Sequence, residues 1–309
     1  MTPAFSECRI LSVGNFSVYG ASNTCLHRTE AMKALGAFVE TVDSGCELRS
    51  YTVRIAKRLY VLGVPLYLPD ISAVNRRIQE AILNSRWDIL WIDKGLTITP
   101  RTFEFVRRHQ PDCLIAGYSP DDMGNHYNQS RQFLEGCSCY DVFFTTKSFN
   151  VAELRALGSP RVVFIGNGYQ DDFHYPRRLN ASDVERLGGD IGFIGTYEKE
   201  RAEAISFLGS HNMRVTVYGE GWDRMRFSGT VRIKGRPLYG DDYPNAISAF
   251  KINLCFLRKI NRDLQTGRSV EIPACGGFML AERTDEHLRL FEEGKEAEYF
   301  AVSYTHLRA

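Results

Sequence analysis

The chain has 309 residues, and its 38 basic and 37 acidic side chains leave a formal net charge of +1. This balance gives no reason to expect nucleic acid or a membrane surface as a partner, and 44% hydrophobic residues are typical of a soluble globular protein. The sequence shows neither the pattern of a signal peptide nor an apolar run near the ~20 residues that cross a bilayer. We therefore expect a cytoplasmic protein of two ordinary-sized domains without a transmembrane segment.

The cysteines favour a reducing compartment. Cys113, Cys255 and Cys275 stand in apolar segments, where cysteine serves as a small buried residue. Cys137 and Cys139 form a C-x-C pair with no second Cys or His pair nearby, so a zinc site is not expected. No Asp-x-Asp or other ligand cluster stands out, and we expect neither a metal nor a cofactor.

The first half of the chain alternates apolar strand-like runs with helical patterns, which predicts a parallel sheet. We expect helices at 23–35, 53–62, 71–84 and 102–109. We expect strands at 9–13, 37–42, 88–93, 113–118, 141–144 and 161–165.

The opening strand, turn, helix and strand also suit a nicotinamide-binding half. Asp43 stands at the end of the second strand, where a ribose-binding acid would be. The turn reads GNFSVYG, however, and lacks a glycine two residues after Gly14. The dinucleotide fingerprint therefore fails at its second glycine, where the backbone must approach the pyrophosphate.

Three strand ends in this half are polar, at 93–94, 119–122 and 145–147. Because the carboxyl ends of parallel strands share one edge of a sheet, functional side chains are expected there. Asp121 and Asp122 are candidates for a catalytic base or acceptor ligand, although adjacent carboxylates also suit a turn or a helix cap. His126 is a third candidate, and its alternative is a solvated loop histidine.

The second half repeats the pattern after an irregular polar stretch at 172–189, which we take as a linker between domains 1–171 and 190–309. Helices are expected at 199–208, 243–249 and 266–275. Strands are expected at 190–194, 214–218, 230–234, 252–257, 278–281 and 297–302.

Several residues near strand ends in this half are candidates for ligand binding. Arg201, in the first turn of a helix, could bind a diphosphate or could be a solvated helix residue. Trp222 follows a tight turn whose glycines permit positive φ, and it could stack on a base or pack over the core. The loop positions that we expect to line the site are Gly195, Thr196 and Gly219.

The segment 266–282 carries the strongest signal. Thr266 is expected to cap a short helix that ends before Gly276 and Gly277. Arg268 falls in the first turn, where a cation opposes the helix dipole unless an anion lies between them. Glu271 shares a face with Arg268. An anion-binding helix start beside a carboxylate that can hold hydroxyls suits a sugar nucleotide, and a surface ion pair is the alternative.

This segment resembles the C-terminal signature of group 1 glycosyltransferases with the GT-B fold, and it is most similar to the spore-maturation-protein, CgeB-like branch. Similar features recur at 93–95, 120–122, 145–148 and 218–222. The positions that carry the resemblance in the signature are Thr266, Arg268, Glu271, Ala274, Gly276, Gly277 and the FEEGKE block at 291–296.

The resemblance implies an α/β fold of two Rossmann-like domains facing each other across a cleft, with the donor bound by the second. It implies metal-independent transfer of a sugar, as in hexosyltransferases, from a nucleotide-diphosphate-sugar donor to an unidentified acceptor that enters from the first domain. Glu271 matches the second of two glutamates that face the donor in the related enzymes and would hold the ribose, and Asp263 stands at the position of the first. The diphosphate would be held by Arg268, Arg201 and the backbone N–H groups of Gly267 to Ser269.

Two alternatives stay open: a sugar-nucleotide epimerase of the same fold, and a non-catalytic nucleotide-sugar-binding protein. The resembling family continues with further helices after its last strand. Residues 303–309, SYTHLRA, do not fit that pattern and look like translated adapter sequence. We therefore expect a second domain that is truncated at its C-terminus.

Overall fold

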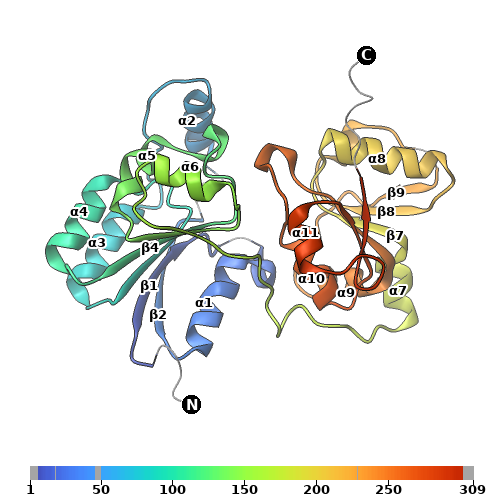
Figure 1. The fold of residues 1–309 in the computed structure, drawn as a ribbon, viewed down its shortest axis with the longest axis horizontal. Helices are drawn as coiled ribbons and strands as arrows, with labels where there is room; N and C mark the ends of the chain where they lie inside the picture. The colour runs from blue at the N-terminus through green and yellow to red at the C-terminus, as the bar shows by residue number, and fades with distance from the viewer. Residues whose placement is uncertain (1–5, 18, 46–49, 228, 302–309) are drawn as a thin grey trace. The chain divides into compact units, whose positions relative to one another are not determined.

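The computed structural model describes residues 6–17, 19–45, 50–227 and 229–301. The chain divides into two compact units, Met1–Gly166 (unit 1) and Asn167–Ala309 (unit 2). Each unit is built on a parallel sheet with helices between the strands (Figure 1).

Unit 1 holds a sheet of six described strands in the order β2-β1-β3-β4-β5-β6. The strands are β1 (Arg9–Gly14), β2 (Phe38–Asp43), β3 (Ile89–Asp93), β4 (Leu114–Ser119), β5 (Val142–Thr145) and β6 (Val162–Phe164). The helices are α1 (Thr24–Ala34), α2 (Tyr51–Val61), α3 (Val74–Asn84), α4 (Pro100–His109), α5 (Arg131–Gly136) and α6 (Asn150–Ala156).

The core of unit 1 lies between this sheet and its helices. Figure 1 shows α1 on one face of the sheet and α3 with α4 on the other. Because both faces are covered, the strands are apolar at successive positions. Leu11, Ile78, Leu90 and Phe103 are among the fully buried side chains that fill the core.

Unit 2 holds six described strands in the order β12-β11-β10-β7-β8-β9. The strands are β7 (Gly189–Ile194), β8 (Val215–Tyr218), β9 (Val231–Ile233), β10 (Phe250–Cys255), β11 (Met279–Glu282) and β12 (Glu298–Phe300). The helices are α7 (Ala181–Leu187), α8 (Lys199–Ser210), α9 (Asp242–Ala249), α10 (Arg268–Ala274) and α11 (Asp285–Leu290).

In both sheets the order of the strands reverses at the first strand, so that later strands are added on both sides of it. In unit 1, β1 lies between β2 and β3, and in unit 2, β7 lies between β8 and β10. The loops that leave the two central strands at such a point run to opposite sides and open a crevice at the carboxyl edge, where ligands of doubly wound sheets bind. The two crevices are therefore the first places to look for a site.

Every strand predicted from the apolar runs is present, with ends that differ by at most two residues. The predictions omitted α5, α6, α7 and α11, which are short. Helix α7 forms inside the stretch 172–189 that we expected to be irregular, and Asn180 caps it by accepting from the Asp183 amide at 2.8 Å. The expectation about 303–309 lies outside the described residues.

Candidate functional site

Two arginines meet at the crevice of unit 2. Arg201 comes from α8 and Arg268 from α10, and their guanidinium carbons lie 5.6 and 5.7 Å from the ring centre of Phe193. Arg201 donates to the carbonyl oxygen of Thr196 at 3.1 Å, and Arg268 donates to that of Phe256 at 3.4 Å. The two carbonyls follow β7 and β10, so the pair stands at the carboxyl ends of these neighbouring strands.

The arginine pair has unused donors. Arg201 is 4% exposed, and Nε and Nη2 of Arg201 and Nε of Arg268 are buried without a hydrogen-bond acceptor among the residues that the structure describes. Burial, followed by the charge of Arg268, lowers the pKa of Arg201 to about 10. Unsatisfied buried donors and like charges both cost free energy. An anion with several acceptor oxygens would relieve both costs.

The loop before α10 contributes further charge. Arg258 also lowers the pKa of Arg201, whereas Glu198 and Asp263 raise it. Asp263 is held by its own turn, since it accepts from the Arg258 amide at 3.3 Å. The structure thus brings the predicted residues Arg201, Asp263 and Arg268 together.

Glu271 lies one turn along α10 from Arg268 and is positioned by two aromatic side chains. Tyr243 donates its hydroxyl to Oε2 of Glu271, and burial, followed by this carboxylate, raises the pKa of Tyr243. Oε1 lies 4.0 Å from Nε2 of His174. Because Nδ1 of His174 accepts from the Gln170 amide at 3.1 Å, the proton of the neutral ring stands on Nε2, toward Glu271. Sequence reasoning missed both His174 and Tyr243.

The start of α10 differs from the prediction. Helix α10 begins at Arg268 after Gly267, and Thr266 does not cap it with its side chain. Ser269 instead accepts from the Thr266 amide at 3.0 Å, while its own amide donates to the Thr266 carbonyl at 2.9 Å. Ser269 is fully buried and its hydrogen bonds are used within the turn, so the geometry gives no support to its predicted contact with substrate. Gly267 is close to the carboxylate, because a Cβ there would lie 3.0 Å from Oε1 of Glu271.

A buried histidine fixes this turn from behind. His287 of α11 is fully buried, with Nδ1 2.6 Å from the carbonyl oxygen of Glu282 and Nε2 2.7 Å from Oγ of Ser269. A carbonyl can only accept, so Nδ1 carries the proton and Nε2 accepts from Ser269. The neutral imidazole therefore connects β11 to the turn that leads into Arg268. Sequence reasoning gave His287 no role.

Stability at mildly acidic pH tests this connection. Burial lowers the pKa of His287, although Glu282 and Glu286 oppose the shift. Because the pKa of His287 is lower in the folded protein than its unfolded value near ~6.5, the neutral ring contributes its full stabilisation above pH ~6.5. That stabilisation is lost as the pH falls toward the pKa of the folded state. We expect the free energy of unfolding, measured by urea denaturation, to decrease between about pH 7 and 5.5, with a contribution of up to ~1.4 kcal/mol per pH unit from this group.

The variant His287→Asn should be less stable at neutral pH and should lose this part of the pH dependence. His211→Asn is the matched control, because His211 is exposed at the end of α8. An unchanged pH slope in His287→Asn would show that another group titrates.

The turns after β7 and β8 contact each other and help to position Arg201. Trp222 is buried, packs edge-on against Phe193, and donates its indole N–H to the carbonyl of Gly195 at 2.8 Å. The predicted stacking of a base on Trp222 is therefore replaced by packing over the core. Gly219 has φ of 143° and lies against Gly195. Thr196 is exposed and contributes its backbone carbonyl to Arg201.

Unit 1 has its own cavity of about 220 Å³ at the carboxyl ends of β1, β3 and β4. Two ion pairs line it: Arg28 lies 2.5 Å from Asp93, and Lys94 lies 2.5 Å from Asp121. Lys94 has φ of 65°, a conformation that non-glycine residues adopt rarely and often at functional sites. The cavity thus presents both signs of charge beside Asp121.

The other two candidates of unit 1 lie elsewhere. Asp122 is fully buried and accepts from the Asn150 side chain at 2.7 Å and the Gly124 amide at 3.1 Å, so it organises the turn as the alternative interpretation held. His126 stacks on the ring of Tyr60 at 4.4 Å and is not among the residues that line the cavity. A catalytic role for either residue has no geometric support.

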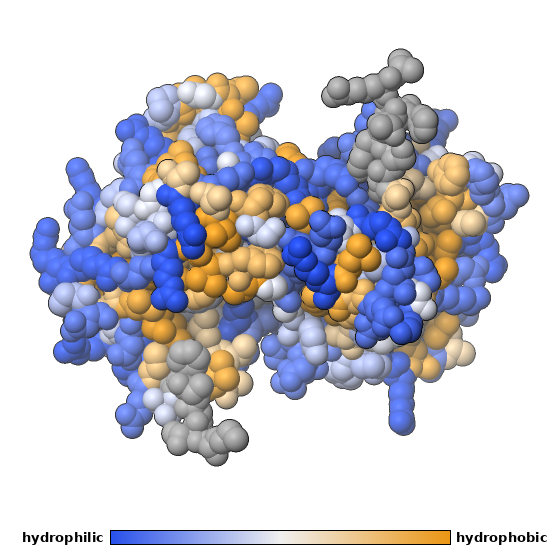
Figure 2. Space-filling model, viewed as in Figure 1, coloured by the Kyte–Doolittle hydropathy of each residue, from blue (hydrophilic) through white to orange (hydrophobic). Residues whose placement is uncertain are grey.

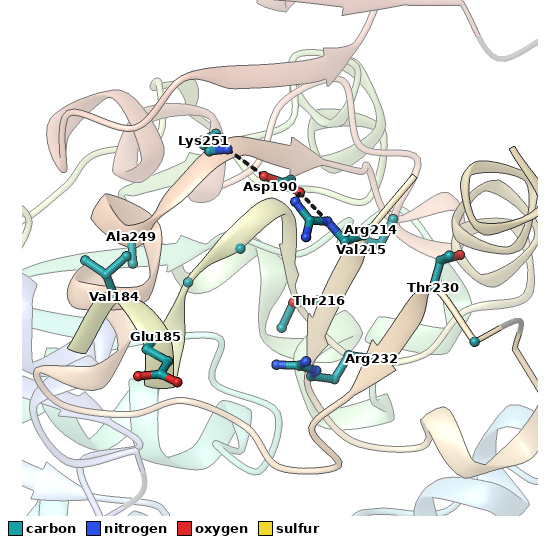
Figure 3. A pocket seen from close by; sticks show the side chains of 13 residues that line it. Val184, Glu185, Asp190, Arg214, Val215, Thr216, Thr230, Arg232, Ala249 and Lys251 are labelled. Atoms are coloured by element: carbon teal, nitrogen blue, oxygen red, sulfur yellow. Dashed lines mark hydrogen bonds and ion pairs between the residues drawn. The ribbon is translucent and has the colours of Figure 1, made fainter. Parts of the chain in front are cut away.

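A wider cavity of about 530 Å³ lies at the opposite edge of the unit 2 sheet, where its strands begin. Figure 3 shows Asp190 between Lys251 and Arg214, to both of which it is paired. Both cations are more than three-quarters exposed, and exposed pairs of this kind contribute little. This cavity shows no unsatisfied buried donor in the part of the chain that the structure covers, unlike the arginine pair.

Among the described residues, no group of three or more His, Cys, Asp or Glu side chains is placed to hold a metal ion. In the same part of the chain, no helix is both long and apolar enough to span a membrane.

Part of the chain matches a known family. A family model described as glycosyl transferase-like matches residues 199–307, which include the arginine pair and Glu271. No curated protein matches the chain.

Solved structures resemble most of the chain. An alpha-glucosyltransferase in complex with UDP and DNA is 12% identical, with a TM-score of 0.55 over 89% of this chain and 79% of that one. A UDP-forming trehalose-phosphate synthase from Burkholderia xenovorans is 10% identical, with a TM-score of 0.54 over 89% and 84%. The UDP-GlcNAc 2-epimerase from Methanocaldococcus jannaschii is 7% identical, with a TM-score of 0.52 over 95% and 89%.

Likeness at this level of identity shows the fold alone. The chain has an α/β fold of two Rossmann-like units of the GT-B class, as the sequence predicted. What the site does has to be argued from its own residues.

Proposed function

We propose that the protein is a glycosyltransferase that takes a sugar, such as a hexose, from a nucleotide-diphosphate-sugar donor bound by unit 2. The buried arginine pair carries the proposal. Arg201 and Arg268 together offer three buried nitrogen atoms whose N–H groups find no acceptor among the described residues. A diphosphate supplies acceptor oxygens and the opposite charge, and it is the group that departs in sugar transfer. Fixed donors that stabilise the departing charge are a major source of catalysis and require no metal.

We assign the remaining groups to other parts of the two substrates. Glu271, held by Tyr243 and facing His174, would accept hydrogen bonds from the ribose hydroxyls of the donor. In unit 1, Asp121 and the cavity beside it would receive the acceptor. Two comparisons support this assignment: the family match over the arginine pair, and the similar fold of an alpha-glucosyltransferase that is in complex with UDP.

Glu271→Gln tests the ribose contact. We expect the affinity for UDP, measured by titration calorimetry, to fall by roughly tenfold to a hundredfold, because a hydrogen bond to a charged group is worth ~1.5–3 kcal/mol. The fold should survive, since glutamine can still accept from Tyr243. Glu203→Gln on the exposed face of α8 is the matched control. An unchanged UDP affinity in the folded variant would exclude the ribose role.

Product analysis separates this proposal from its two alternatives. A glycosyltransferase releases UDP in proportion to the acceptor consumed. An epimerase returns an altered nucleotide sugar, and a binding protein gains thermal stability with UDP without any turnover. The epimerase remains a candidate because one such enzyme is among the structural neighbours.

A further inference from the structure

Helix α2 of unit 1 has an apolar side that faces solvent. Its inner side buries Val53, Ala56 and Tyr60. Outside this set, large apolar side chains recur at helical spacing on the exposed face. They are Tyr51 (70% exposed), Ile55, Leu59 and, at the end of the helix, Leu62 (72% exposed). Figure 2 shows apolar residues at the surface where Figure 1 places α2.

The segment that follows α2 enlarges this exposed apolar area. Val64, Tyr67 and Ile71 are also exposed, so large apolar residues recur at the surface from 51 to 71. In α3 and α8, by contrast, Leu83 and Phe207 are each the one large apolar side chain of the described helix that is exposed. A run of this kind in a soluble unit usually marks a surface that contacts something else.

The charges around the apolar face are basic. Residues 50–69 contain no Asp or Glu, and Arg54, Lys57 and Arg58 lie within α2. Arg54 and Arg58 are exposed, and neither has an ion-pair partner among the residues described. Glu135, the nearby acid that contacts Tyr67, is already paired with Arg131. The surface therefore combines apolar side chains with two exposed cations that have no ion-pair partner in the described part of the chain.

We propose that this surface, which we call the α2 face and define as Tyr51, Arg54, Ile55, Arg58, Leu59 and Leu62, docks unit 1 on an anionic lipid bilayer. An amphipathic helix with cations beside its apolar stripe lies in the plane of a membrane interface, with the stripe among the acyl chains and the cations at lipid phosphates. A protein partner would need its own acidic rim around an apolar groove, whereas an anionic bilayer offers both features over any area. Docking needs no membrane-spanning helix.

The proposal adds to the proposed function without depending on it. If the chain transfers sugar, docking would bring unit 1 to an acceptor carried by the membrane, a consequence that rests on the proposed function. UDP binding by unit 2 and vesicle binding by unit 1 are measured separately, so either can fail alone.

Vesicle flotation of the full chain tests the docking. We expect binding to vesicles of phosphatidylglycerol and phosphatidylcholine, and much weaker binding to phosphatidylcholine alone. Arg54→Gln with Arg58→Gln should weaken binding to the anionic vesicles roughly thirtyfold, at about fivefold for each cation near the surface. Ile55→Glu with Leu62→Glu should abolish it. Leu83→Glu, at a site 63% exposed on α3, should bind as the parent does.

Each other outcome overturns the proposal. Equal binding to neutral and anionic vesicles, or equal loss in the Leu83→Glu control, would show nonspecific adhesion. Absence of vesicle binding by the parent would contradict docking directly. A dimer in sedimentation that Ile55→Glu with Leu62→Glu dissociates, without vesicle binding, would show that a second copy covers the α2 face.

Discussion

Replacing Arg201 with methionine is expected to make the ligand-free protein more stable while it removes most of the affinity for UDP. Two guanidinium nitrogens of Arg201 are buried without an acceptor in the described part of the chain, and Arg268 adds like-charge repulsion. Methionine fills similar space without either cost. We expect the free energy of unfolding to rise by about 1–2 kcal/mol, because buried unsatisfied donors are destabilising.

The same change should weaken UDP binding by roughly a hundredfold, because it removes charge-assisted bonds to the diphosphate. The opposite signs distinguish this site from a structural one. If Arg201 were a structural residue, its replacement would lower the stability of the protein, and any loss of UDP affinity would follow from unfolding. Opposed effects of this kind are common where a site is built for a ligand at the expense of the free protein.

Urea denaturation and calorimetry with UDP measure the two effects. Arg214→Met is the matched control, since Arg214 is 77% exposed at the opposite edge of the same sheet. It should change neither quantity appreciably. A less stable Arg201→Met variant with full UDP affinity would refute the anion site and, with it, the main support for the proposed function.

The strands could be predicted because their signal is local. Apolar runs such as 9–13 and 88–93 are buried on both faces in any doubly wound sheet, so the sequence alone locates them. Short helices such as α7 were missed because seven residues give too few turns to show a period. Their stability comes from capping and packing, which the local pattern records poorly.

Residues of the candidate site could be named from the sequence where the type of side chain near a helix start was sufficient, and their roles stay predictions. Partners that lie far apart along the chain were missed. Arg201, Arg268 and Glu271 were found from their positions near helix starts. The burial of Arg201 was not predictable, because it depends on Phe193 and on the loop before α10. His174 and Tyr243 reach Glu271 from far along the chain, and only the topology brings them together.

Gly219 shows the same dependence on topology, and its replacement by alanine should have the largest effect on stability. Gly219 has φ of 143°, a backbone conformation that residues with a side chain rarely adopt. A Cβ at this position would overlap the carbonyl oxygen of Gly195 and lie 2.6 Å from the carbonyl carbon. That carbonyl accepts the indole N–H of Trp222, and the next residue, Thr196, holds Arg201. The backbone cannot yield without moving both.

We therefore expect Gly219→Ala to lower the free energy of unfolding by roughly 3–5 kcal/mol, the combined cost of backbone strain and overpacking. Any folded fraction should bind UDP more weakly, because the turn that positions Arg201 is displaced. Gly168→Ala is the matched control in the same unit, since a Cβ there meets no atom within 4 Å among the described residues. Denaturant midpoints compare the two variants. A Gly219→Ala protein as stable as Gly168→Ala would mean that the turns after β7 and β8 do not touch as described, and the placement of Arg201 would have to be revised.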